Sequence, residues 1–455
     1  MTLAPGIFRQ YDIRGIVGRD LTPEAARAVG RAYAALLAER RIAGAIAVGR
    51  DNRPSGPSLR EALVDGLTSC GVDVVDVGVV PTPLLYWALH HSGVVGGVQI
   101  TGSHNPPEYN GLKLSVGATS LHGDEIQHLY QLALRGAFPG GRGAVRHEAV
   151  IDRYVDDVIA RIGPLAREMN VVYDCGNGAG ALVAPALFER LGLHATGLFT
   201  ESDGTFPNHH PDPTVEENLE DLIAEVRRER AEIGIAFDGD ADRIGVVDED
   251  GEVVWGDRIL IVYARDVLAR TGRGQPIIFD VKCSQALPQA VEAAGGKPVM
   301  WKTGHSLIKD KMREMRAPVA GEMSGHMFFA EGFYGHDDAL YGAARLLAIL
   351  ARSGKTIKQI LADVPSYVTT PEIRIEVPEE RKFGIVERAV REFSRTHEVI
   401  DVDGARVLFG DGWGLLRASN TQPVLVARYE ARSRDRLQAI RGEMEGWMRA
   451  QGVEV

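Results

Sequence analysis

Short apolar runs alternate with helical segments along most of this chain, and this alternation limits its folds more than any other feature. The segment 44–56 begins as an apolar run and ends in a polar loop, and 96–106 has the same form. Between them, 59–71 has helical spacing and ends at a glycine, and 72–80 has the composition of a strand. Strands that alternate with helices are typical of βαβ units and largely parallel sheets.

The alternating pattern begins again twice further along the chain. It resumes at 169–180 and at 275–284, in each case just after a polar or glycine-rich stretch. A chain of 455 residues has room for about two to four domains of ordinary size. We therefore expect an α/β protein with three related α/β domains, each built on a mixed, mostly parallel sheet.

The C-terminal segment has a different order of elements. A predicted strand at 366–378 precedes an amphipathic helix at 379–397, several strands follow, and a final helix spans 434–451. Strands clustered between two helices indicate a smaller α+β domain. The four predicted domains are residues 1–149, 150–252, 253–366 and 367–455.

Composition and charge argue against several classes of protein. With 45% hydrophobic and 25% charged residues, the chain has the composition of a globular protein, not of a disordered or fibrous one. Its net charge of −11 makes duplex nucleic acid and anionic membranes poor partners. Three scattered cysteines are too few for a disulfide framework, and no run of 18 apolar residues occurs. MTLAPGIFRQ lacks a basic region followed by an apolar one, so we expect no signal peptide. We expect a cytoplasmic protein with no nucleic-acid and no membrane partner.

The loop at 101–113, TGSHNPPEYNGLK, follows a predicted strand and places Ser103 between Gly102 and His104. In parallel sheets, ligands bind at the loops that follow the carboxyl ends of strands. A serine in such a loop can act as a nucleophile when a base or a metal ion activates it. The alternative is an ordinary turn serine.

Three aspartates, Asp238, Asp240 and Asp242, alternate in the loop after the apolar run 233–237. Carboxylates so close repel one another unless a cation neutralises them, and all-oxygen ligands favour Mg²⁺ or Ca²⁺. The spacing also resembles an EF-hand, but Arg243 stands where that loop needs glycine, and the flanking segments are strands. We therefore predict a Mg²⁺ site, with a solvated turn as the alternative.

Two further loops combine side chains suited to a polar ligand. In GEMSGH, Glu322, Ser324 and His326 alternate, so in an extended loop they point to one side and can bind a polyol. The alternatives there are a metal site and a turn satisfied by its own hydrogen bonds. RASNTQP is a candidate anion site because it combines an arginine with short donors, and a surface hairpin is its alternative. Its candidate residues are Arg417, Ser419, Asn420 and Thr421.

Basic residues near predicted strand ends complete the candidate site, although each alone is more often solvated or ion-paired. They are Arg14, Lys113, Arg243, Lys282, Lys302 and His305. A separate pattern, CGNGAGA at 175–181, has the form of a dinucleotide-binding fingerprint, with Glu201 at the position of the ribose acid. Because such short patterns arise by chance in a glycine-rich chain, we prefer a tight strand-to-helix turn.

Taken together and in order, these loops resemble the α-D-phosphohexomutase superfamily. The resemblance covers the whole chain through FRQYDIRG, TGSHNPPEYNGLK, DGDADR, KTGHS, GEMSGH and RASNTQP, and the ordered set is more specific than any single motif. It implies four domains around a central cleft, which agrees with the division above. GEMSGH and RASNT resemble the bacterial phosphomannomutase/phosphoglucomutase branch. The alternative is the phosphoglucosamine mutase branch, which usually has Gln in place of Met323.

The resemblance also implies a role for each candidate residue. Ser103 is expected to be the phosphorylated nucleophile. The expected Mg²⁺ ligands are a phosphoserine oxygen of Ser103 and the carboxylates of Asp238, Asp240 and Asp242. The candidates for general acid/base or electrostatic duty are Arg14, Lys113 and His326. The residues expected to bind substrate are Tyr11, His104, Arg243, Lys282, His305, Glu322, Ser324, Arg417, Ser419, Asn420 and Thr421.

The implied reaction interconverts hexose 1-phosphate and hexose 6-phosphate, of mannose, glucose or both, through a phosphoserine enzyme. Hexose 1,6-bisphosphate is the implied intermediate and activator. The partners are then small hexose phosphates, and we expect a monomer or a small homo-oligomer. Two other classes remain: a metal-dependent sugar phosphatase and a non-catalytic protein that binds sugar phosphates. The intact serine and the three aspartates argue against the non-catalytic class.

Overall fold

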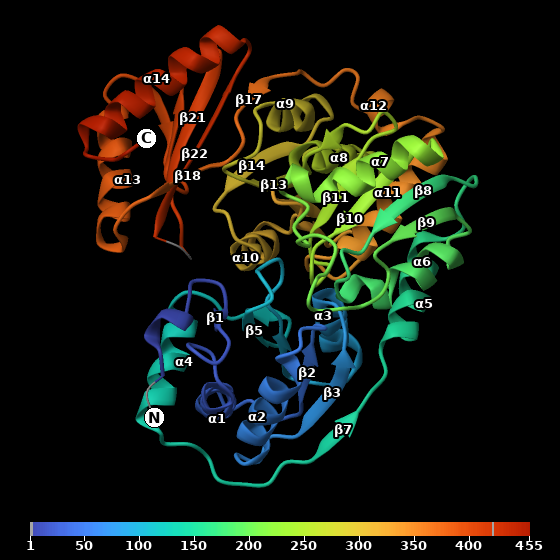
Figure 1. Ribbon diagram of the computed structural model, residues 1–455, viewed down its shortest axis with the longest axis vertical. Helices are drawn as coiled ribbons and strands as arrows, with labels where there is room; N and C mark the ends of the chain where they lie inside the picture. The colour runs from blue at the N-terminus through green and yellow to red at the C-terminus, as the bar shows by residue number, and fades with distance from the viewer. Residues whose placement is uncertain (1–2, 421–422) are drawn as a thin grey trace.

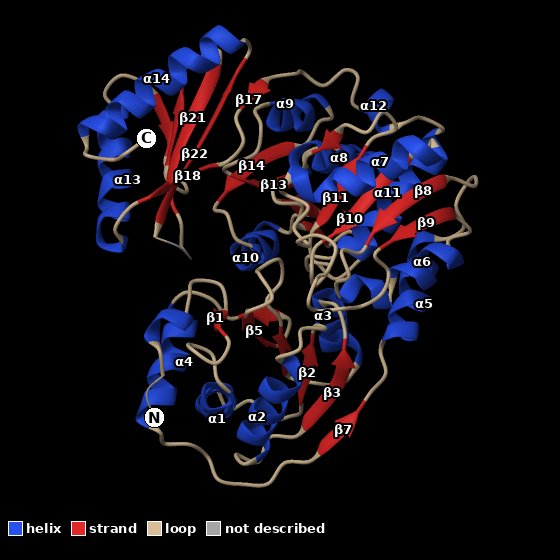
Figure 2. Ribbon diagram, viewed as in Figure 1, coloured by secondary structure: helices blue, strands red, loops and turns tan. Residues whose placement is uncertain are grey.

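The computed structural model describes residues 3–420 and 423–455, and it shows three α/β domains in succession followed by a C-terminal domain (Figure 1). Figure 2 shows that the sheets are separate and that helices pack against each of them. The predicted fold class, three α/β domains with mixed sheets and a smaller α+β domain, is confirmed. Across the described ranges, no helix is long and apolar enough to cross a membrane.

The first domain is built on a mixed sheet in the order β1-β5-β4-β2-β3-β7, with β6 on β5. Its strands are β1 (Ile13–Ile16), β2 (Ile46–Arg50), β3 (Val74–Val79), β4 (Gly96–Ile100), β5 (Tyr109–Val116), β6 (Thr119–Ser120) and β7 (Val145–His147). Its helices are η1 (Pro5–Ile7), α1 (Pro23–Glu39), α2 (Gly56–Thr68), α3 (Thr82–His91) and α4 (Asp124–Arg135). Strands β2 and β4 are parallel neighbours, so the loops that follow them adjoin at one edge of the sheet.

The second domain has the sheet order β12-β11-β10-β8-β9. Its strands are β8 (Asn170–Asp174), β9 (His194–Leu198), β10 (Ile233–Phe237), β11 (Ile244–Val247) and β12 (Val253–Val254). Its helices are α5 (Ile151–Ile162), η2 (Ala179–Leu182), α6 (Ala184–Arg190), η3 (Glu216–Leu219) and α7 (Glu220–Glu229). Because β10 and β11 pair antiparallel, the three aspartates lie in the turn of a hairpin.

The third domain has the sheet order β14-β13-β15-β16. Its strands are β13 (Pro276–Asp280), β14 (Lys297–Trp301), β15 (Val319–Gly321) and β16 (Met327–Phe329). Its helices are α8 (Gly256–Thr271), α9 (Ala286–Ala293), α10 (His305–Met315), α11 (Ala339–Ser353) and α12 (Ile357–Ile360). The sequence GEMSGH forms the turn between the antiparallel strands β15 and β16.

The C-terminal domain is an antiparallel sheet with two helices. Its strands are β17 (Val368–Thr369), β18 (Ile373–Glu376), β19 (Glu398–Ile400), β20 (Ala405–Leu408), β21 (Gly412–Ala418) and β22 (Val424–Ala431). Its helices are α13 (Glu379–Phe393) and α14 (Arg434–Ala450). The strand predicted at 366–378 is divided into β17 and β18, and Pro371, which has no N–H to donate to a sheet, lies between them.

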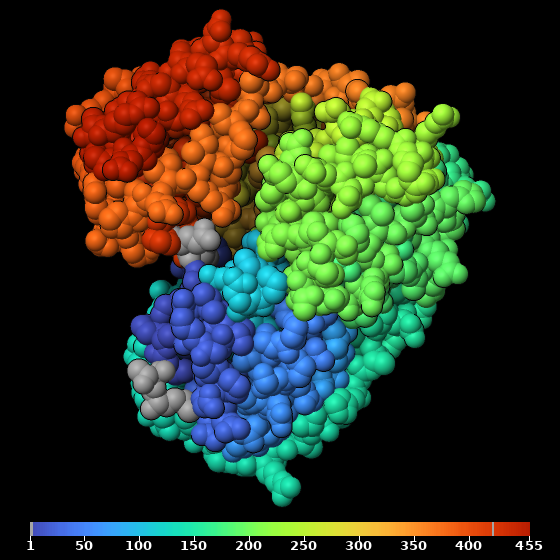
Figure 3. Space-filling model, viewed as in Figure 1, coloured from blue at the N-terminus to red at the C-terminus, as the bar shows by residue number. Residues whose placement is uncertain are grey.

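One apolar core extends through the first three domains, the first domain has a second core that includes residues of α1, α2 and α4, and the C-terminal domain has a core of its own. The shared core includes Trp87 of α3, Phe237 of β10 and Phe329 of β16. Arg406 anchors the C-terminal domain, because its guanidinium donates to two carbonyl oxygens of the loop after β13, at 2.6 and 2.7 Å. The same guanidinium lies 3.8 Å from the ring centroid of Trp413. In the space-filling view, the surface is hollowed between the C-terminal domain and the other three (Figure 3).

Candidate active site

Ser103 lies in the loop after β4, and its backbone has a left-handed conformation. Its φ of +51° is a value that residues with a side chain rarely adopt, and strain of this kind clusters at functional sites. The side chain is buried, and Oγ donates a hydrogen bond to Asp238 Oδ2 at 2.9 Å. His104 Nδ1 lies 3.1 Å from the same hydroxyl oxygen. The serine hydroxyl therefore points at the aspartate loop of the second domain.

Arg53, just after β2, holds the serine loop in place. Its guanidinium is completely buried and donates to four carbonyl oxygens of that loop, including that of Ser103 at 2.7 Å. Asp51 accepts from Arg53 Nε at 3.2 Å and from the backbone N–H of Gly102 at 3.1 Å. The sequence did not reveal this residue, because DNRPSG reads as a polar loop and Ser103 lies 50 residues further along the chain.

The three aspartates are completely buried in the turn between β10 and β11. One carboxylate oxygen of each lies within 4.8 Å of the others. Asp240 Oδ1 and Asp242 Oδ1 have no hydrogen-bond partner among the described residues, although His326 Nδ1 lies 3.6 Å from Asp242 Oδ1, and burying a polar atom without a hydrogen bond is costly. Burial and the charges of Asp242 and Asp240 raise the pKa of Asp238 well above its ordinary value. Buried carboxylates that repel one another and keep oxygens without hydrogen bonds fit a hard divalent cation.

Lys113 on β5 binds two of these carboxylates. Its Nζ donates to Asp240 Oδ2 at 2.8 Å and to Asp242 Oδ2 at 2.5 Å. Burial disfavours the charged ammonium, but the two carboxylates outweigh this effect and raise the pKa of Lys113 well above its ordinary value. The hydroxyls of Thr82 and Thr101 also donate to Asp240 Oδ2. Protein donors thus bind Oδ2 of Asp240 and of Asp242, and Oδ1 of each stays available to a cation.

Two arginines bring positive charge to the serine loop. Arg14 on β1 donates to Asn105 Oδ1 at 2.9 Å. Arg243, in the aspartate turn, donates from Nε to His326 Nε2 at 3.1 Å. Burial and the charges of Arg243 and Arg14 lower the pKa of His104 well below its ordinary value. Cationic side chains from two domains therefore face the loop that carries the serine.

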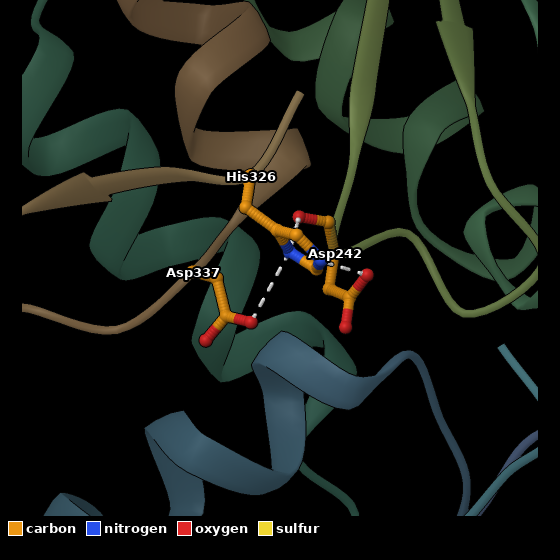
Figure 4. A group of neighbouring side chains, drawn as sticks. All are labelled: Asp242, His326 and Asp337. Atoms are coloured by element: carbon orange, nitrogen blue, oxygen red, sulfur yellow. Dashed lines mark hydrogen bonds and ion pairs between the residues drawn. The ribbon is translucent and has the colours of Figure 1, made fainter. Parts of the chain in front are cut away.

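The turn between β15 and β16 carries Glu322, Ser324 and His326. Glu322 Oε1 accepts from the backbone N–H of Gly304 at 2.5 Å, and burial raises the pKa of this carboxyl. The His326 ring points toward Asp242, whose backbone oxygen lies 3.1 Å from Nδ1 (Figure 4). Ser324 is half-buried in the same turn. The turn thus contacts the aspartate loop through His326 and the start of α10 through Glu322.

Tyr11 joins the first domain to the third and to the C-terminal domain. Its hydroxyl donates to the backbone oxygen of Thr303 at 2.7 Å and accepts from Asn420 Nδ2 at 2.7 Å. Burial raises the pKa of Tyr11 to about 12, so the phenol keeps its proton for the first of these bonds. Arg417 on β21 is buried, and its Nε donates to Asp403 Oδ2 at 3.0 Å.

The remaining predicted residues are placed as follows. Lys282, in the loop after β13, is buried and donates to a carboxylate of the segment before β18 at 3.3 Å. His305 begins α10, and its ring centroid lies 6.5 Å from that of Tyr11. Ser419 is buried directly after β21. Thr421 lies outside the described residues.

The glycine-rich sequence 175–181 packs against the aspartate loop. Its Ala179 N–H donates to the backbone oxygen of Gly239 at 2.9 Å. A Cβ at Gly178 would lie 2.8 Å from the same oxygen, so the two backbones are in direct contact. The helices η2 and α6 follow the turn. The preferred interpretation, a tight strand-to-helix turn, is confirmed.

The sequence analysis also missed Lys309 and Asp337, two buried residues near His326. Lys309 Nζ donates to Asp337 Oδ1 at 3.0 Å. The one sign in the sequence is the pair of aspartates in HDDA before a helix, since a single carboxylate suffices for an N-cap. Asp338 is that cap and accepts from the backbone N–H of Tyr341 at 2.8 Å. Asp337 is therefore not needed as the cap of α11, and its carboxylate is available to interact with side chains of the candidate site.

Comparison with known proteins shows similarity over the whole chain. Models of the phosphoglucomutase/phosphomannomutase family match in order: alpha/beta/alpha domain I at 5–139, domain II at 152–251, domain III at 255–367 and the C-terminal domain at 372–446.

Relatives and solved structures agree with these matches. A phosphomannomutase/phosphoglucomutase of Pseudomonas aeruginosa is 47% identical over 450 residues, which cover 99% of this chain and 96% of the relative. A phosphoglucomutase of Neisseria gonorrhoeae is 47% identical, with 96% of both chains covered. The crystal structure of a phosphoglucomutase/phosphomannomutase family protein from Burkholderia thailandensis superposes with a TM-score of 0.93. It is 44% identical, with 99% of this chain and 98% of that chain covered.

Proposed function

Because the chain belongs to the phosphoglucomutase/phosphomannomutase family, we propose that it interconverts hexose 1-phosphate and hexose 6-phosphate, with mannose, glucose or both as the sugar. The observation that carries this proposal is the hydrogen bond from Ser103 Oγ to Asp238. Asp238 is one of three buried aspartates, and the other two each have a carboxylate oxygen without a hydrogen-bond partner among the described residues. Phosphoryl transfer needs positioning and charge neutralisation more than covalent chemistry. A serine beside a cation site and Lys113 meets both needs.

Mg²⁺ is the proposed metal. The proposed ligands are a phosphoserine oxygen of Ser103 and the carboxylates of Asp238, Asp240 and Asp242, which fit because two of their buried oxygens lack a partner in the described chain. When bound, the ion would neutralise charge on the phosphoryl oxygens. We propose hexose 1,6-bisphosphate as the activator, because it can donate a phosphoryl group to Ser103 Oγ.

The proposed cycle consists of two phosphoryl transfers. In the first, the bond between phosphorus and Ser103 Oγ breaks, a bond between phosphorus and O6 of hexose 1-phosphate forms, and the O6 proton passes in net to Ser103 Oγ. The bisphosphate then reverses its orientation in the site, so that its 1-phosphate faces Ser103. In the second transfer, Ser103 Oγ attacks the phosphorus on O1, the bond between that phosphorus and O1 breaks, the proton of the serine hydroxyl passes in net to O1, and hexose 6-phosphate remains. The side chains proposed to assist are Arg14, Lys113 and His326.

The remaining residues are proposed to bind the substrate. Glu322 and Ser324 are assigned to the sugar 3- and 4-hydroxyls, which glucose and mannose share. The loop of Arg417 is assigned to the phosphate that is not being transferred, because a guanidinium can make two parallel bonds to it. The contacts of Tyr11 with two other domains support a site between them. The other proposed residues are His104, Arg243, Lys282, His305, Ser419, Asn420 and Thr421.

The proposal is tested by assaying glucose 1-phosphate, mannose 1-phosphate and glucosamine 1-phosphate side by side with trace hexose 1,6-bisphosphate. We expect turnover of glucose 1-phosphate, mannose 1-phosphate or both to the 6-phosphate. A strong preference for glucosamine 1-phosphate would favour the sister activity, and steady release of inorganic phosphate would indicate a phosphatase. A cytoplasmic location and a monomeric or small homo-oligomeric state complete the proposal.

Arg417→Ala is expected to raise KM about 10- to 100-fold for both glucose 1-phosphate and mannose 1-phosphate, because it removes charge-assisted bonds to a phosphate that both contain. Some loss of kcat should accompany it, since the held phosphate positions the far end of the substrate. The measurement is steady-state kinetics with each sugar phosphate. The control is Arg436→Ala, which removes an arginine of α14 that is paired with Asp411. This variant should leave both KM values unchanged. A change in KM for only one of the two sugar phosphates would show that Arg417 contacts the sugar and not the shared phosphate.

Arg53→Lys is expected to lower kcat about 10- to 100-fold, because one ammonium cannot bind the four carbonyls that the guanidinium reaches. Arg50→Lys, in the neighbouring β2, is the control, since Arg50 makes a single bond to the Asp51 backbone oxygen at 3.2 Å. Kinetics and melting temperature should be measured together for both variants. Wild-type kcat in a folded Arg53→Lys protein would mean that the serine loop keeps its shape without this arginine.

A further inference from the structure

Both ring nitrogens of the buried His326 are engaged, and their partners define where its proton sits. Nδ1 lies 3.1 Å from the backbone oxygen of Asp242, and Nε2 lies 3.1 Å from Arg243 Nε. A carbonyl oxygen can only accept a hydrogen bond, and an arginine Nε can only donate one. The hydrogen-bond network therefore assigns the proton of His326 to Nδ1 and the lone pair to Nε2.

Asp337 stands beside the protonated nitrogen. It is completely buried, and its Oδ2 lies 3.4 Å from His326 Nδ1, as Figure 4 shows. Its Oδ1 accepts from Lys309 Nζ at 3.0 Å, which holds the carboxylate in one orientation. A carboxylate next to one ring nitrogen of a histidine favours the proton on that nitrogen and leaves the other as an acceptor. Asp337 thus favours the tautomer that Arg243 requires.

The same three groups, Asp242, His326 and Asp337, are close enough to bind a cation. The hydrogen bonds argue against that interpretation. Lys309 already neutralises the carboxylate of Asp337. In addition, a metal on Nδ1 would displace the proton that the Asp242 carbonyl accepts. The cluster is better explained as a support for Arg243.

We infer that Asp337 is a positioning residue, which acts through the His326 tautomer to hold the Arg243 guanidinium by its Nε. An arginine fixed at Nε by His326 can direct its terminal nitrogens at phosphoryl oxygens, and one of them, Nη1, also lies 3.8 Å from Asp212 Oδ1. The backbone N–H of Arg243 is also held, by Asp238 Oδ1 at 3.1 Å, so both ends of this residue are constrained. The inference rests on the proposed phosphoryl transfer and assigns its positioning to a completely buried residue, whose Oδ2 also lies 3.6 Å from His305 Nδ1.

The first test is Asp337→Asn, which keeps the volume and removes the charge. We expect kcat to fall about 10- to 100-fold, as is typical when the support of a functional side chain is lost, with KM changed less than about threefold. The control is Asp338→Asn, in the adjacent buried aspartate that caps α11 and binds the Tyr154 hydroxyl, which should lower the melting temperature but not kcat.

Because Asp337→Asn leaves Lys309 buried without a counter-charge, the double variant Lys309→Met/Asp337→Asn is made as well. It removes both charges and should show the same fall in kcat with a melting temperature closer to wild type. Full kcat in this folded double variant would overturn the inference.

The second test asks whether the effect passes through His326. His326→Gln keeps an oxygen that can accept the Arg243 Nε–H, whereas His326→Ala does not, so we expect at least about fivefold more kcat from the glutamine variant. In the His326→Ala background, adding Asp337→Asn should lower kcat no further. An additional loss equal to that of Asp337→Asn alone would show that the two residues act independently and would overturn the inference.

A third measurement does not depend on activity. In protein with ¹⁵N-labelled histidine rings, NMR should show the His326 proton on Nδ1 in the wild type, with population moving to Nε2 in Asp337→Asn. An Nε2 proton in the wild type would overturn the inference even if the enzyme is an active mutase. Failure of the proposed function would instead appear as wild-type protein that turns over no hexose phosphate, so the two failures are distinct.

Discussion

Ser103→Ala is expected to lower kcat by at least about 10³-fold with every hexose phosphate, because no other group can replace the hydroxyl that we propose carries the phosphoryl group between substrates. The fold should persist, since the loop is held by Arg53 through backbone oxygens that the substitution leaves in place. Turnover is measured with trace hexose 1,6-bisphosphate. Mass spectrometry of the wild-type peptide that contains Ser103 should show phosphoserine.

The matched control is Ser115→Ala. Ser115 is also a buried serine of the first domain, but it lies on β5, next to β6, and is not part of the proposed site. Its replacement should change kcat less than about twofold. Wild-type-like turnover in Ser103→Ala, or phosphate found on a different residue, would rule out Ser103 as the nucleophile.

Removal of Mg²⁺ with EDTA should abolish turnover, and added Mg²⁺ should restore it. Asp240→Asn is expected to lower kcat about 10²- to 10³-fold at ordinary Mg²⁺ and to raise the Mg²⁺ concentration needed for half-maximal rate. The reason is that the substitution removes one negative charge from the buried triplet with little change in volume. The measurements are rate against Mg²⁺ concentration and melting temperature with and without Mg²⁺.

Asp248→Asn provides the control for the metal experiment. Asp248 is a buried aspartate just after β11, but its Oδ1 accepts the backbone N–H groups of Asp250 and Glu252, at 3.0 and 2.9 Å, and is not part of the triplet. It should leave the Mg²⁺ dependence unchanged. If chelation has no effect on the wild-type rate, the aspartate triplet is not a catalytic metal site.

The order of elements could be predicted from the sequence, because apolar periodicity and turn residues act over a few residues at a time. The run 44–56 contains β2, the helical spacing of 59–71 lies over α2, and the final predicted helix corresponds to α14. The break between β17 and β18 was missed, although Pro371 marks it. Which strands become neighbours, as β5 does between β1 and β4, depends on contacts far apart in the chain and could not be predicted in this way.

The sequence by itself determined which chemical groups the proposed site contains, because each group lies in a short loop whose residue types can be recognised locally. The aspartate turn, the serine loop and the arginine loop are examples. Only the tertiary structure decided how these groups are held. Arg53 reaches the serine loop from the end of β2, Lys113 reaches the aspartates across two domains, and Asp337 reaches His326. These contacts form only when the sheets pack together, because burial and long-range hydrogen bonds, not local spacing, select the partner of each charge.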